Sequence, residues 1–230
     1  MSAVQFTNLV VLLTDIFMPL TAVTIFILIN RAAIWQPISK LAAFPLVLAL
    51  IWASLWTWWP PLASIRFQPP PTGQGGAIFL VIISFVGLLA FNSVRQIFAN
   101  ADLKIFLWLG PWRIFYGTAL LVIGLAGGLP AEFFWTASLG DIAVGAWAVS
   151  MLARLKTVSS KEILLWNILG LADLIHVLAI GAFSLGRFFS IHPEFSPPSL
   201  LPIAGVPMMI AMHVYALWAF TRARLNDANT

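Results

Sequence analysis

Residues 163–187 read ILLWNILGLADLIHVLAIGAFSLGR, and this stretch decides the fold. Its only polar residues are Asn167, Asp173, His176, Ser184 and the closing Arg187. A helix over these residues would be about 38 Å long at the usual rise per residue. The hydrocarbon core of a bilayer is about 30 Å thick, so the stretch predicts a helix that crosses a membrane.

The rest of the chain repeats this pattern. Of the 230 residues of the whole chain, 61% are hydrophobic, whereas a soluble domain holds about 45–50% apolar residues. The first segment has no basic residues before it and contains Asp15 and Pro19, so we expect a spanning helix and not a cleaved leader. We predict an all-α integral membrane protein, a single-domain seven-transmembrane-helix bundle over 1–230, with helices at about 7–30, 40–59, 76–94, 108–129, 133–153, 163–187 and 203–222.

The basic residues predict the orientation of this bundle. Seven spans put the termini on opposite sides, and ten of the twelve Lys and Arg residues then fall on the C-terminal side. Only Arg66 and Arg187 fall on the other side. Cytoplasmic loops carry the excess of Lys and Arg. We therefore expect the N-terminus outside, the C-terminus in the cytoplasm, and a multi-pass location in the cell inner (cytoplasmic) membrane.

The composition also excludes several partners and cofactors. With no cysteine, the chain has no ligands for an iron–sulfur cluster. Covalent retinal requires a lysine in the last span, and residues 203–222 contain none. The basic residues lie between apolar segments, where they set membrane orientation, so we expect the lipid bilayer and no nucleic acid as partner.

Eleven tryptophans are expected mainly at the headgroup level, where the indole ring is half in lipid and its N–H is hydrated. In this interpretation Trp135 lies near an outer helix end. Trp166 lies near an inner one.

Five ionisable residues lie inside segments otherwise suited to hydrocarbon: Asp15, Asp141, Asp173, His176 and His213. A charge at bilayer depth costs several kcal/mol unless it is paired or neutralised, so such residues usually face the bundle interior and serve a function. Asp173 and His176 are three residues apart on one helix face. His213 falls at a similar depth in the next helix, so the sequence predicts that these three side chains share one level.

The other polar residues support or extend this site. Asp141 lies near mid-depth between Gly140 and Gly145, which would let another helix approach closely. Asp15 is nearer the outer surface and is as consistent with an interfacial position as with a pathway. Arg113 either extends to the lipid headgroups or pairs with a buried acid, and Asn167 would hydrogen-bond to a neighbouring helix.

These residues fit three chemistries. The leading hypothesis is a site that binds and transports a proton, a cation or a small solute through Asp173, Asp141, His176 and His213. The second is a divalent metal held by His176, His213 and Asp173, in an enzyme acting on a lipid or isoprenoid inside the membrane. The third is a b-type haem between His176 and His213. An accessory subunit of a larger membrane complex is a further alternative, and the sequence leaves open whether the protein is an enzyme.

Overall fold

The computed structural model describes the backbone of residues 1–32, 102–192 and 205–227, with separate positions between 82 and 98. The side chains described extend to Thr14 in the first helix, with Phe17, Leu20 and Thr24, and to Arg222 in the last. The spans predicted at 40–59 and 76–94 lie outside these described residues, apart from a few positions in the second. The side chain of Asp15 lies outside them as well.

The described residues form five α-helices and one 3-10 helix, and they contain no strand. In chain order they are α1 (Ala3–Ala32), η2 (Leu103–Leu109), α6 (Gly110–Leu125), α7 (Ala131–Ala153), α8 (Ser160–Ile191) and α9 (Val206–Asp227). The prediction of an all-helical protein is therefore confirmed for this part of the chain.

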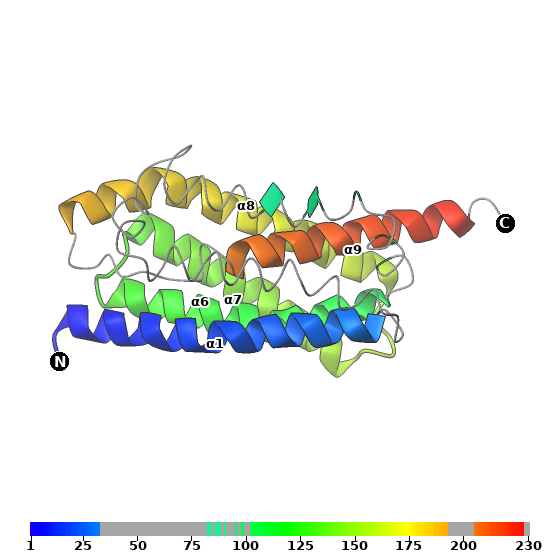
Figure 1. Cartoon of the computed structure of the whole chain (residues 1–230), viewed down its shortest axis with the longest axis horizontal. Helices are drawn as coiled ribbons and strands as arrows, with labels where there is room; N and C mark the ends of the chain where they lie inside the picture. Colours follow the sequence, from blue (N-terminus) through cyan, green and yellow to red (C-terminus); the bar gives the residue numbers. More distant parts are fainter. Residues whose placement is uncertain are drawn as a thin grey trace.

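The helices lie along the long axis of the molecule (Figure 1). Helices α6, α7 and α8 follow one another in alternating directions, and α1 begins at the opposite end of the bundle from the end of α9. Helix α1 packs on α6, where the rings of Phe17 and Phe115 meet edge to face with centroids 5.1 Å apart.

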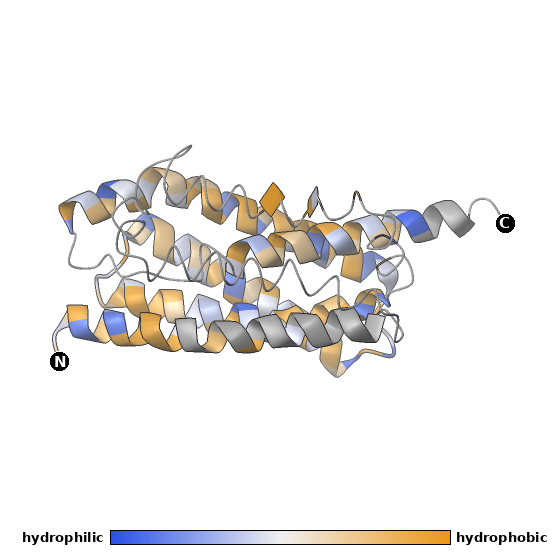
Figure 2. Ribbon diagram, viewed as in Figure 1, coloured by the Kyte–Doolittle hydropathy of each residue, from blue (hydrophilic) through white to orange (hydrophobic). Residues whose placement is uncertain are grey.

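Within the described residues, three stretches are long and apolar enough to cross a membrane: Leu103–Leu125, Ala131–Ala153 and Ser160–Ile191. Figure 2 shows mostly hydrophobic ribbons, interrupted by hydrophilic positions around the middle of the bundle. The described part of the chain thus supports a helical membrane protein with three candidate spans.

Local signals explain where these helices begin. The Ser159 hydroxyl accepts a hydrogen bond from the Glu162 backbone N–H at 3.2 Å, which caps the start of α8. The Asp102 carboxylate accepts one from the Lys104 N–H at 3.0 Å. This cap starts η2, so the segment predicted from 108 begins five residues earlier.

The turn between α6 and α7 needs a glycine. Gly127 has φ = +83°, a left-handed conformation that glycine adopts without a steric penalty. The Gly128 N–H then donates to the carbonyl of Ile123 at 3.0 Å. These contacts end α6 at Leu125, before the limit of 129 that the hydropathy pattern predicts.

Three glycines spaced by seven residues, Gly110, Gly117 and Gly124, bring α6 close to α7. A methyl group on Gly117 would lie 2.9 Å from both the Asp141 Cβ and the Ser138 carbonyl oxygen. One on Gly145 of α7 would lie 2.6 Å from the Gly110 carbonyl oxygen. The close approach of these two helices therefore depends on glycines, which have no side chain, as is usual for helices packed in lipid.

Candidate functional site: a buried arginine between two aspartates

Arg113 of α6 is the centre of a polar cluster inside the bundle, with only 1% of its surface exposed. Its Nε donates to Asp141 Oδ1 of α7 at 2.8 Å, and its Nη2 pairs with Asp173 Oδ2 of α8. The third nitrogen, Nη1, donates to the Gly170 carbonyl oxygen at 3.1 Å and lies 3.2 Å from Nε2 of His213. The guanidinium thus joins α6, α7, α8 and α9.

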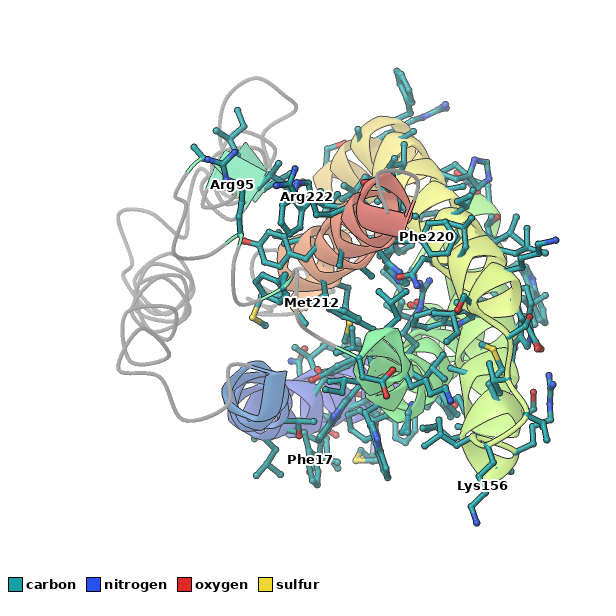
Figure 3. The ribbon with its side chains drawn as sticks, turned by 90° about the vertical axis from the view of Figure 1, so that its right-hand side faces the viewer. Phe17, Arg95, Lys156, Met212, Phe220 and Arg222 are labelled. Atoms are coloured by element: carbon teal, nitrogen blue, oxygen red, sulfur yellow. The ribbon has the colours of Figure 1, made fainter. Side chains whose placement is uncertain are left out.

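The cluster lies near the middle of the candidate spans. Arg113 is the eleventh of the 23 residues of Leu103–Leu125, and Asp141 is the eleventh of the 23 residues of Ala131–Ala153. Asp173 is the fourteenth of the 32 residues of Ser160–Ile191. The side chain of Lys156, by comparison, points away from the helices at the periphery of the bundle (Figure 3).

The hydrogen bonds around His213 specify its tautomer. Arginine only donates, so the His213 Nε2 that faces Nη1 must accept. The proton is then on Nδ1, which lies 2.9 Å from the Asn167 Oδ1 and donates to it. The Asn167 Nδ2 donates to the Ile163 carbonyl oxygen at 2.9 Å, which orients the amide with its oxygen toward the imidazole. His213 is therefore a neutral acceptor for Arg113.

The ring of Trp166 packs against the imidazole of His213. Its ring centroid lies 4.9 Å from that of His213, and its Nε1 donates to the Val144 carbonyl oxygen at 2.9 Å. It is fully buried. The expectation that Trp166 anchors at the membrane interface is wrong, because its indole N–H is satisfied by the backbone of α7 and needs no water.

Two glycines make room for the cluster. A methyl group on Gly170 would lie 2.6 Å from the His213 Cε1 and 3.1 Å from the Arg113 Nη1. One on Gly140 would overlap the Asp173 carboxylate. Gly140, which the sequence indicates as a helix-packing residue, therefore admits the side chain of Asp173 between α7 and α8.

The charges of the cluster do not balance. One guanidinium faces two carboxylates, and the neutral His213 adds no charge, so the cluster carries one excess negative charge when both aspartates are ionised. The carboxylates also retain some exposure, 13% for Asp141 and 15% for Asp173. The acids are therefore more accessible than the arginine that pairs them.

Of the three side chains predicted to share one level, the structure brings two together. Asp173 and His213 both contact Arg113, whereas His176 is exposed on the surface of α8, one turn away from Asp173. Asp141 joins the cluster directly, Asn167 joins it through His213, and the side chain of Asp15 lies outside the described residues.

The alternative ligand sets do not assemble in this geometry. Among the described residues, no three His, Asp or Glu side chains gather closely enough to hold a metal ion. The haem arrangement needs a free nitrogen on His213, but Asn167 and Arg113 face its two nitrogens. His176 and His213 also face different surroundings, one exposed and the other fully buried.

The sequence left two roles open for Arg113, extension to the headgroups or pairing with a buried acid, and did not predict that Arg113 lies at the centre of the cluster. A signal was present in the spacing of Gly110, Gly117 and Gly124. Arg113 is three residues after the first and four before the second, so it lies on the same face of the helix. A glycine face that approaches another helix this closely would carry Arg113 into the bundle.

These features define a class, a helical membrane protein with a buried, charge-imbalanced Arg–Asp–Asp–His cluster. Within that class the chain belongs to the family described as a domain of unknown function (DUF8737), whose model matches residues 71–221. The matched region includes Arg113, Asp141, Asp173 and His213. No curated protein and no solved structure matches the chain.

Proposed function

We propose that this protein is a seven-span inner-membrane transporter that binds a proton or a cation at the Arg113 cluster. One observation carries the proposal: two carboxylates face a single guanidinium near the middle of three candidate membrane spans. Charged residues at this depth commonly mark ion and proton pathways.

The charge imbalance indicates what the site would bind. In a medium of low dielectric constant a neutral cluster is strongly favoured over a charged one. Adding one proton to Asp141 or Asp173, or placing one monovalent cation beside them, makes the cluster neutral. Because both carboxylates are more exposed than Arg113, the exchanging charge would reach the acids while the guanidinium stays in place.

The proposed topology has the N-terminus outside and the C-terminus in the cytoplasm. One end of the bundle holds the start of η2, the connection between α7 and α8, and the end of α9. This end carries five basic residues: Lys104, Arg154, Lys156, Lys161 and Arg222. Arg187 lies near the opposite end. An excess of Lys and Arg is typical of cytoplasmic loops, which supports this orientation. The proposal includes two further spans at about 40–59 and 76–94.

Transport can be measured with purified protein in liposomes. Wild-type protein should carry protons or a monovalent cation down an imposed gradient. A pH-sensitive dye inside the liposomes reports proton flux and a sodium-sensitive dye reports cation flux, so the two dyes distinguish the two ions. Asp173→Asn and Asp141→Asn should each reduce the flux at least about tenfold, because either change removes the excess charge.

Glu132→Gln is the matched control, because Glu132 is an exposed carboxylate at the start of α7 and touches no member of the cluster. Its flux should equal that of the wild type. Wild-type flux no higher than in protein-free liposomes would sink the transport proposal. Flux that survives Asp173→Asn would remove the cluster from the pathway and favour the accessory-subunit alternative.

A further inference from the structure

Ser138 of α7 has a fully buried hydroxyl with no hydrogen-bond partner among the described residues. It lies three residues before Asp141 on the same helix, so the two side chains are neighbours on the helix surface. Both residues contact α6, because a methyl group on Gly117 would lie 2.9 Å from the Ser138 carbonyl oxygen and from the Asp141 Cβ. The unpartnered hydroxyl therefore lies one helical turn from a carboxylate of the cluster.

Other hydroxyls inside the candidate spans do have partners. A serine or threonine within a helix commonly donates to a carbonyl of the preceding turn. Five hydroxyls make such a bond at 2.7–2.9 Å: Thr118, Thr136, Ser150, Ser184 and Ser190. Ser138 makes none. A buried hydroxyl without a partner is costly, so its persistence at this position indicates a bound partner such as an ion or a water molecule.

Asp141 also has an oxygen without a hydrogen bond. The Arg113 Nε donates to Oδ1, whereas no described residue donates to Oδ2. A charged oxygen and a neutral one thus belong to neighbouring side chains on α7. Oxygen ligands of this kind suit hard metal cations, which need several of them. A proton needs only the carboxylate and gives the hydroxyl no role.

We infer that Ser138 and Asp141 bind a sodium ion, with Ser138 Oγ and Asp141 Oδ2 as ligands. Resting on the proposed function, this site makes sodium and not a proton the transported ion. One monovalent cation neutralises the excess negative charge of the cluster, whereas a divalent cation would leave it positive. The hydroxyl adds a ligand without adding charge, and the partial exposure of Asp141 allows water to supply further ligands.

Sodium binding can be measured without transport, by thermal unfolding of the purified protein in detergent. Sodium chloride replaces choline chloride at constant ionic strength. A ligand that binds only the folded state raises the Tm, so the Tm of the wild type should rise with sodium concentration. Ser138→Ala should raise the sodium concentration of half-maximal effect about tenfold, because the ion loses a ligand. In sodium-free buffer this variant should unfold at the wild-type Tm or above it, because alanine removes an unpartnered buried hydroxyl.

Ser184→Ala is the matched control, because Ser184 is a buried serine of α8 whose hydroxyl donates to the Ile180 carbonyl oxygen. Its sodium dependence should equal that of the wild type. Equal sodium dependence in Ser138→Ala and the wild type would overturn the inference. A wild-type Tm that does not respond to sodium would also overturn it, and proton flux in liposomes would then leave the transport proposal standing. Sodium stabilisation that Ser138→Ala weakens, without flux of either ion, would support the site and contradict transport alone.

Discussion

Arg113 is a long cation that finds all its described partners inside the protein. Four of its five N–H groups have defined acceptors, on Asp141, Asp173, Gly170 and His213. A buried ion pair is not in itself a source of stability, because removing each ion from water costs several kcal/mol. Breaking such a pair is nevertheless expensive, because the remaining charge is then buried alone.

We therefore expect Arg113→Met to lower the free energy of unfolding by about 3–5 kcal/mol. Met has a similar length but no charge, so both carboxylates lose their cation. Arg113→Lys should lower the free energy of unfolding by less, because lysine keeps the charge. It should still lower it, because lysine cannot donate to several acceptors at fixed angles. Equilibrium unfolding in mixed detergent micelles measures the difference.

Arg154→Met provides the comparison, because Arg154 also pairs with a carboxylate, that of Glu162, but lies exposed at the end of α7. Exposed ion pairs contribute little, so this variant should unfold close to the wild type. If Arg113→Met and Arg154→Met have the same free energy of unfolding, the buried cluster does not stabilise the fold.

At the scale of the elements, α6 and α7 are held close by residues that lack side chains. Gly117 packs against the backbone of Ser138 and the Cβ of Asp141, one turn away from Arg113. The distance between these helices sets the distance between the guanidinium and Asp141. Helix packing and site geometry therefore depend on the same glycines.

Gly117→Ala should destabilise the protein by about 1–3 kcal/mol, the usual cost of overpacking. Alanine favours helix by up to about 1 kcal/mol over glycine, so the steric term must outweigh that gain. The same variant should also reduce ion flux, because moving α6 away from α7 separates Arg113 from Asp141. Thermal unfolding and liposome flux would be measured on one preparation.

Gly87→Ala is the matched control, since a methyl group there meets no atom within 4 Å. It should be neutral or slightly stabilising. Equal stability of the two variants would contradict the close packing assigned to Gly117.

At the scale of the whole molecule, the proposed orientation places the turn between α6 and α7 outside and the connection between α7 and α8 in the cytoplasm. Ala131 begins α7, and Thr157 precedes α8; both are exposed. In the cysteine-free chain, Ala131→Cys should react with a membrane-impermeant maleimide on intact cells. Thr157→Cys should react only after the membrane is opened.

Labelling in the reverse order would invert the proposed topology. Labelling of both positions on intact cells would show that α7 does not span the membrane. The cysteine-free wild type reports background labelling in each case.

The sequence by itself determined that this chain is helical, with apolar stretches long enough to cross a membrane, and where each polar residue lies along its helix. Apolar stretches of more than 20 residues have few other stable states, because every backbone group must be hydrogen-bonded within lipid. Position along a helix gives depth directly. For this reason Asp141, Asp173 and His213 could be selected as candidates without knowledge of the fold.

The tertiary structure decided which of these residues meet. His176 and His213 have similar predicted depths, yet one faces outward and the other is fully buried against Arg113. The difference is one of rotation about the helix axis, which is set by the contacts of glycines and large side chains between helices. Hydropathy along a chain that is apolar on every face carries little information about that rotation, so the pairing of Arg113 with two aspartates required the packed bundle.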